Sequence, residues 1–74
     1  MRIVFPNRQI GRRILLLRKA KEMTPEQLAE ASGCSLLSLL RLESGTLLEI
    51  ESTQLSGICT TLGVSLESLT SDQA

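Results

Sequence analysis

Residues 24–45, TPEQLAEASGCSLLSLLRLESG, carry the start and stop signals of two short helices joined by a tight turn. Thr24 suits the N-cap of the first helix, and Gln27 completes a capping box. Pro25 suits the first helical position because it has no N–H to leave unpaired there. Gly33, which has no Cβ, allows the left-handed turn that ends this helix. These cap residues and Gly33 predict a short helix and a tight turn before the next helix.

The second helix of this segment is predicted to begin after the N-cap Ser35 and to end just before Gly45. Since successive residues turn by about 100°, one side carries Leu39 and Leu42, which we expect in the core. The opposite side carries Leu36, Leu37, Leu40, Arg41 and Ser44. Leucine supplies three of these five residues, although this side is expected to meet water.

The residues before this segment predict an extended stretch followed by a longer helix. Residues 1–6 combine β-branched and aromatic side chains with a proline that disfavours helix just before it. Because one strand cannot stand alone, this stretch either packs on the helices, pairs with the same strand of a second subunit, or frays. Asn7 can cap a helix that runs to about residue 22, and its inner stripe is Ile10, Ile14 and Leu17.

The residues after this segment predict a connector, a fourth helix and a final capped turn. The connector, residues 46–51, is more apolar than most loops. The helix begins near Ser52 and ends before Gly63, and residues 64–69 form the turn. The inner residues of these elements are Leu55, Ile58, Cys59, Leu62, Leu66 and Leu69. Residues 70–74 are predicted to fray.

The composition limits the chain to one small helical domain. Its 74 residues are too few for a second core, so residues 1–74 are predicted to form a single domain with its core in 8–69. Leucine supplies 15 residues and Phe5 is the only aromatic, which favours an all-α fold. The sequence shows no secretory pattern and no apolar run long enough to span a membrane, so the cytoplasm is the expected location.

The chain lacks the residue types that most enzymes and metal sites require. It has no histidine, the commonest general base, and nothing in it resembles a nucleophile elbow or a phosphate-binding glycine loop. Cys34 and Cys59 stand at no metal-ligand spacing. We expect two small buried thiols, with a disulfide as the weaker alternative. No catalytic residue, metal ion, cofactor or small-molecule substrate is therefore predicted.

The charges are divided between the two parts of the chain, although the net charge is zero. Residues 1–21 hold seven of the eight basic side chains and no acid. Residues 22–74 hold all eight acids and, of the basic residues, only Arg41. Two interpretations are open: the two parts pair with each other inside the fold, or a basic face is left to meet phosphate.

The ordered set of these motifs resembles the Cro/C1-type (XRE-like) helix-turn-helix domain family over about residues 8–69. The residues that carry the resemblance are Ile10-Gly11, Ile14, Leu17-Arg18, Thr24, Gln27-Leu28-Ala29, Gly33, Ser35, Leu39, Leu42-Glu43, Gly45, Leu62-Gly63-Val64-Ser65-Leu66 and Leu69. The resemblance implies a five-helix repressor-like domain whose helix-turn-helix unit is residues 24–45. It also implies that Arg18 of the first helix forms an ion pair with Glu43 at the end of the third.

In this family the second helix crosses the DNA backbone and the third lies in the major groove. The resemblance therefore assigns DNA contacts to Thr24, Pro25, Ser35, Leu36, Leu37, Leu40, Arg41 and Ser44. If the domain binds DNA, the clustered positive charges of Arg2, Arg8, Arg12 and Arg13 are expected to contact phosphate. The chain departs from the family pattern at Leu36 and Leu37, where polar residues are usual. Leucine offers a base edge no hydrogen bond, only contact with a thymine methyl group, so Arg41 is the side chain on the third helix that can bind guanine or phosphate.

Two functions follow from this mixture of features. The first is a sequence-specific transcriptional regulator that binds double-stranded DNA as a homodimer. The second uses the same domain for protein binding, as an antitoxin, an anti-repressor or an oligomerisation module, with the leucine-rich third helix as the anchor. The leucines in excess of the family pattern are Leu15, Leu16, Leu36, Leu37, Leu40, Leu47 and Leu48. If they are contiguous and exposed, they mark an interface.

Overall fold

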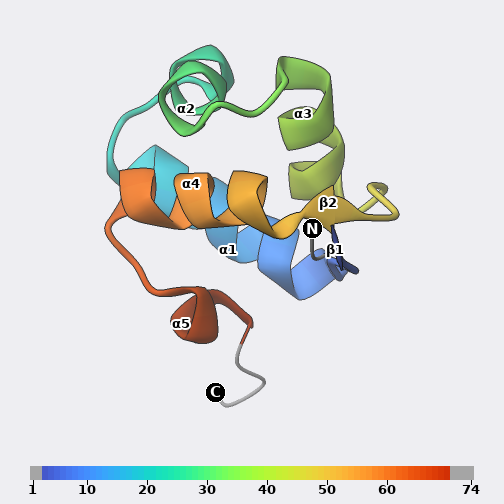
Figure 1. The fold of residues 1–74 in the computed structure, drawn as a ribbon. Helices are drawn as coiled ribbons and strands as arrows, with labels where there is room; N and C mark the ends of the chain where they lie inside the picture. The colour runs from blue at the N-terminus through green and yellow to red at the C-terminus, as the bar shows by residue number, and fades with distance from the viewer. Residues whose placement is uncertain (1–2, 71–74) are drawn as a thin grey trace.

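The computed structural model describes residues 3–70, and the side chains of residues 3–69. Its elements are β1 (Ile3–Val4), α1 (Arg8–Ala20), α2 (Pro25–Ser32), α3 (Leu36–Ser44), β2 (Ile50–Glu51), α4 (Ser52–Leu62) and α5 (Leu66–Thr70). In Figure 1, α2 and α3 lie at one end of the molecule, α1 and α4 cross beneath them, and α5 lies at the other end. The predicted five-helix fold is confirmed. Of the predicted frayed tail, Thr70 ends α5 and residues 71–74 lie outside the described residues.

The caps confirm the predicted starts of α1 and α3 and the predicted end of α3. The Asn7 side chain accepts from the Ile10 N–H at 2.9 Å, and the Ser35 hydroxyl accepts from the Ser38 N–H at 3.1 Å. Both side chains therefore satisfy backbone donors that have no partner inside the helix. α3 ends at Gly45, whose φ of 78° lies in the left-handed region that glycine adopts without strain.

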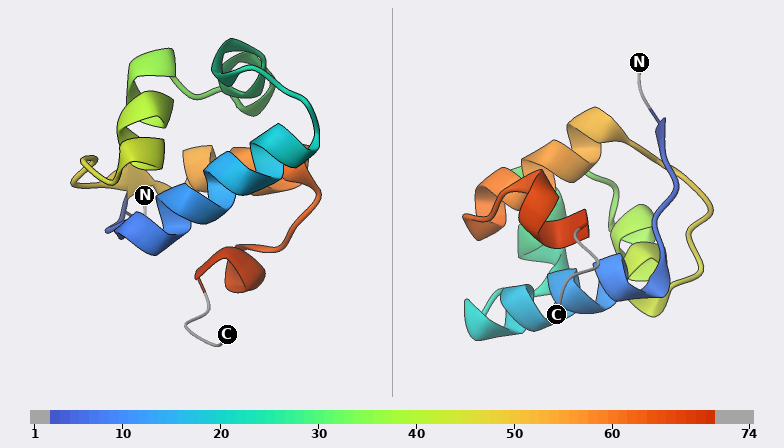
Figure 2. Two further views of the ribbon diagram at one scale, coloured as in Figure 1. Left: turned by 180° about the vertical axis from the view of Figure 1, so that it is seen from behind. Right: turned by 90° about the horizontal axis from the view of Figure 1, so that it is seen from below.

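The core combines the inner faces of the five helices with Cys34 of the turn between α2 and α3 and Ile50 of β2. The largest fully buried side chains are Ile14, Leu28, Leu39, Leu42, Leu55, Ile58 and Leu69. α1 packs against α3 and α2 packs against α4, as the two views of Figure 2 show. Leu17, predicted for the inner stripe of α1, is only partly buried but packs on this core. Within residues 3–70, no helix is both long and apolar enough to cross a lipid bilayer.

Two glycines allow these helices to approach each other closely. A Cβ placed at Gly11 of α1 would overlap the backbone carbonyl of Leu42 in α3. A Cβ placed at Gly57 of α4 would overlap the backbone carbonyl of Ser32 in α2. Because backbone atoms cannot move aside as a side-chain end can, both helix pairs depend on the missing methyl group.

The extended N-terminal stretch pairs within its own chain. β1 and β2 form a two-stranded antiparallel ladder in which Ile3 lies opposite Glu51 and Val4 opposite Ile50. Because side chains alternate along a strand, Val4 and Ile50 pack on the core while Ile3 and Phe5 remain exposed. The sequence did not predict β2, and the pairing explains why the connector of residues 46–51 is so apolar.

Candidate nucleic-acid interface

The helix-turn-helix unit is α2, a turn at residues 33–35 and α3. Gly33 adopts a φ of 74°, and the N–H of Cys34 donates to the Ala29 carbonyl at 3.0 Å. These contacts reverse the chain within one turn, so that α2 and α3 lie next to each other (Figure 1). The turn thereby determines how the start of α3 stands relative to α2.

A buried ion pair holds the other end of α3 on α1. The Nε of Arg18 donates to Glu43 Oε2 at 2.7 Å, and Nη2 donates to Oε1 at 3.1 Å. Both side chains are less than one-tenth exposed. The Nη1 of Arg18 also donates to the Met23 carbonyl at 2.8 Å, which joins the turn between α1 and α2 to the same group. One guanidinium therefore orients α3 against α1 with two parallel bonds.

The outward side of α3 is apolar at its first turns and basic at its last. Leu36, Leu37 and Leu40 are 38%, 60% and 44% exposed. Arg41 and Ser44, on the same side, are exposed as well. The Ser44 hydroxyl donates to the Arg41 carbonyl at 3.0 Å, so it is occupied within the helix. The structure thus brings the predicted α3 residues together on one side, and Arg41 is the only charge among them.

The start of α2 offers few hydrogen-bond donors to a phosphate. The Thr24 hydroxyl accepts from the Gln27 N–H at 3.1 Å, and the Gln27 side chain accepts from the Thr24 N–H at 2.9 Å. Pro25 has no N–H, and Glu26 adds a negative charge to the first turn. The capping box therefore stabilises α2 and consumes two of the backbone donors that a phosphate contact would use.

Arg12 lies beside the end of α3 rather than beside its beginning. It lines a surface hollow of about 340 Å³ together with Arg8, Gln9, Leu15, Glu43 and Ser44. Arg8 and Arg12 are both exposed, and the Arg8 side chain also lies against Gly45. These two arginines therefore supply positive charge at the C-terminal end of α3, beside Ser44 and Gly45.

Arg13 does not belong to this basic group, contrary to the prediction. Its Nη1 donates to the Leu69 carbonyl of α5 at 2.8 Å, and the side chain is partly buried. The reason is the helical period, which turns adjacent residues of α1 by about 100°. Arg2 lies outside the described residues. Both interpretations of the divided charges thus hold in part, since Arg13 and Arg18 bond the C-terminal part while Arg8 and Arg12 stay exposed.

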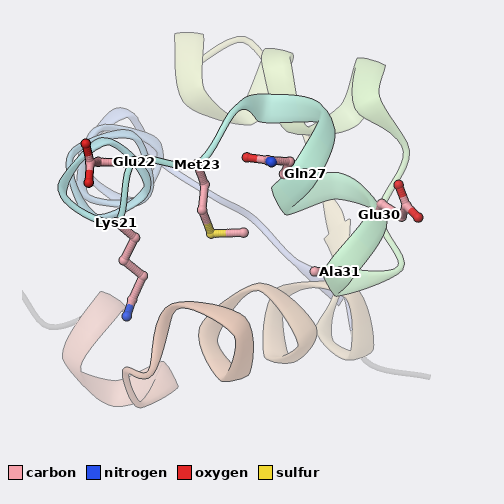
Figure 3. A pocket seen from close by; sticks show the side chains of 6 residues that line it. All are labelled: Lys21, Glu22, Met23, Gln27, Glu30 and Ala31. Atoms are coloured by element: carbon pink, nitrogen blue, oxygen red, sulfur yellow. The ribbon is translucent and has the colours of Figure 1, made fainter.

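A second hollow, of about 550 Å³, lies at the turn between α1 and α2. Figure 3 shows its lining residues, Lys21, Glu22, Met23, Gln27, Glu30 and Ala31. Glu22 adopts a φ of 56°, and its N–H donates to the Lys19 carbonyl at 3.0 Å. Glu22 therefore stands directly after the C-cap of α1, Lys21, in the position that glycine usually takes. The hollow mixes one lysine with two glutamates and presents no single charge to a ligand.

The two cysteines are free and buried, as predicted. Burial raises the pKa of both the Cys34 and the Cys59 thiol. Because the thiolate is the reactive form, iodoacetamide is expected to alkylate both at least about ten-fold more slowly in the folded protein than in denaturant. Mass spectrometry of a timed alkylation at mildly alkaline pH measures the two rates. Equal rates in the two conditions would contradict the burial of these thiols.

The chain belongs to the Cro/C1-type helix-turn-helix DNA-binding domain family, whose model matches residues 13–74. It is 28% identical to a chain of the SinR protein/SinI protein complex, with a TM-score of 0.80, over 85% of this chain and 61% of that one. It is 34% identical to the clp gene regulator ClgR from Corynebacterium glutamicum, with a TM-score of 0.75, over 84% of this chain and 65% of that one.

A third structure, the master regulator for biofilm formation SinR in complex with DNA, is 30% identical with a TM-score of 0.76. The match covers 81% of this chain and 95% of that one. The chain spans less than two thirds of the length of the first two structures, at 61% and 65%. No curated protein matches the sequence.

Proposed function

We propose that the chain is a transcriptional regulator that binds double-stranded DNA by inserting α3 into the major groove. The observation that carries this proposal is the fixed, outward side of α3, which the Arg18–Glu43 pair and the turn at Gly33 hold away from the core. A helix presented in this way, beside a second helix, is the geometry of helix-turn-helix recognition. Membership of a DNA-binding family and the likeness to SinR bound to DNA support it.

The charges assign different tasks to different arginines. Arg41 stands on the outward side of α3, where a guanidinium can donate two hydrogen bonds to O6 and N7 of guanine. Arg8 and Arg12 lie beside the end of α3, where they can contact phosphate. We further propose a homodimer, which places two α3 helices on two half-sites. Leu16 and Leu48, exposed outside α3, are its candidate contacts.

A selection from random duplexes at about 50 mM salt, with the oligomeric state measured in parallel, tests this function. We expect enriched sites whose affinity falls steeply with salt. Arg41→Ala is expected to weaken binding to such a site by about 1–3 kcal/mol, and Arg41→Lys to keep part of the affinity but lose the preference for guanine. Lys21→Ala removes an exposed charge at the second hollow and is the matched control. The function is wrong if no duplex is enriched.

Protein binding is the second candidate function. One observation favours it: Leu36, Leu37 and Leu40 are all exposed on one helix, and Leu48 after that helix is 85% exposed. Such a surface suits insertion into an apolar groove of a partner. Under this function, Leu37→Gln would leave the fold intact and abolish self-association or partner capture. Unchanged association in this variant would argue against it.

A further inference from the structure

The start of α3 presents hydrocarbon where a base-reading helix usually presents polar groups. Leu36 and Leu37 are its first two residues, and Leu40 follows one turn later. The nearby polar group, the Ser35 hydroxyl, already accepts from the Ser38 N–H at 3.1 Å. The first turn of α3 can therefore distinguish base pairs mainly through the methyl groups of leucine, because it offers few hydrogen-bonding groups to a base edge.

The major groove offers one apolar feature that such a surface can match. Each base pair presents hydrogen-bond donors and acceptors in this groove, and thymine alone among the four bases adds a methyl group, on C5. The same methyl group is present on 5-methylcytosine. A leucine side chain against a base edge without this methyl group leaves the polar atoms of that edge without partners, which is unfavourable.

We propose, resting on the proposed function, that Leu36, Leu37 and Leu40 read the C5-methyl groups of pyrimidines in the major groove, with Leu37 as the principal contact. Leu37 is the most exposed of the three, at 60%. Ligands of this surface are therefore duplexes that carry thymine, or 5-methylcytosine, at the position facing the start of α3.

The position of that pyrimidine relative to the guanine follows from helix geometry. Leu37 and Arg41 are four residues apart on the same side of α3. At a rise of about 1.5 Å per residue, their Cα atoms stand about 6 Å apart along the helix axis. Successive base pairs stack about 3.4 Å apart. The methyl group is thus expected within about two base pairs of the guanine that Arg41 contacts.

Deoxyuridine supplies a direct test, because it lacks the thymine methyl group and keeps every hydrogen-bonding atom. In a site selected from random duplexes, each thymine is replaced singly by deoxyuridine and the dissociation constant is measured. We expect about four-fold weaker binding for each contacted methyl group, the loss typical of one buried group of this size. At the same position, 5-methylcytosine is expected to bind about four-fold more tightly than cytosine.

Leu37→Gln connects this effect to α3. Glutamine can donate to N7 and accept from N6 of adenine, which lies in the same base pair as the thymine. The variant is therefore expected to bind the thymine and deoxyuridine duplexes equally while it still prefers that base pair. Phe5→Gln is the matched control, since Phe5 is a 76% exposed apolar residue that lies outside α3, between β1 and α1. It is expected to retain the four-fold difference.

The outcomes separate this inference from the proposed function. A duplex that is selected and bound equally well with deoxyuridine in place of every thymine overturns methyl readout and leaves the DNA-binding function standing. Loss of methyl discrimination in Phe5→Gln as well as in Leu37→Gln also overturns it. Failure to select any duplex, together with loss of self-association in Leu37→Gln, overturns both the methyl readout and the DNA-binding function. That result would identify the α3 leucines as a protein-binding surface.

Discussion

Glu43→Gln is expected to lower the free energy of unfolding by about 3–5 kcal/mol, because it leaves the buried charge of Arg18 without a counterion. Arg18 and Glu43 are less than one-tenth exposed and share two hydrogen bonds, so solvent cannot take over the lost contact. A domain of 74 residues has a total stability of roughly 4–11 kcal/mol. The expected loss is therefore a large share of the whole stability, and circular dichroism during denaturation is expected to show a clearly lower unfolding midpoint for the variant.

Two controls identify the cause of this loss. Glu26→Gln makes the same chemical change at an exposed residue of α2, and the expected loss is below about 0.5 kcal/mol. Replacing both Arg18 and Glu43 by apolar residues of similar size removes the unpaired charge, and it is expected to recover most of the stability. A loss below about 1 kcal/mol in Glu43→Gln would show that the pair behaves as a surface ion pair.

Gly11→Ala is expected to lower the free energy of unfolding by at least about 3 kcal/mol, at the upper end of overpacking effects. The added Cβ would overlap the Leu42 carbonyl, so α1 and α3 must separate to admit it. Since α3 carries the proposed DNA contacts, any folded fraction is also expected to bind DNA less tightly. Chemical denaturation and a duplex-binding titration on the same sample measure the two effects.

Gly63→Ala separates this close approach from the general cost of replacing a glycine. A Cβ at Gly63 meets no neighbouring atom, but its φ of 74° is unfavourable for alanine. The expected loss is therefore only about 1–2 kcal/mol. If Gly11→Ala is no more destabilising than Gly63→Ala, the two helices are not in backbone contact as described.

The helices could be predicted from the sequence because the residues that start or end each helix interact with one another within a few positions. Thr24 and Gln27 form the capping box on their own, and Gly45 ends α3 through its own backbone angle. The inner faces followed from the helical period, as Leu39 and Leu42 illustrate. These features depend little on the rest of the chain, so the sequence was sufficient for them.

Features that depend on distant partners were not predictable in the same way. Ile50 is buried because β1 lies beside it, and β1 is far away in the sequence. Leu47 and Leu48 are adjacent leucines in a connector without regular periodicity, yet Leu47 packs on the core while Leu48 is 85% exposed. Arg13 was assigned to phosphate from charge alone, and its contact with the Leu69 carbonyl requires the position of α5.

The candidate site shows the same limit. The outward side of α3 followed from the helical period, whereas the position of Arg12 beside Ser44 required the packing of α1 on α3. The capping box at Thr24 was predicted, but its effect on the donors available to phosphate became clear only from the two hydrogen bonds.

The β1–β2 ladder also has a consequence for how the domain forms. It joins Ile3 to Glu51 and so closes a loop of nearly fifty residues with only two residue pairs. Closing a loop of this length has an entropic cost that two pairs offset poorly, whereas α1 packs on α3, and α2 on α4, through many more residue pairs. We therefore expect the ladder to assemble late in folding. We also expect it to open before the helices in the native state, so that its amides exchange faster with solvent.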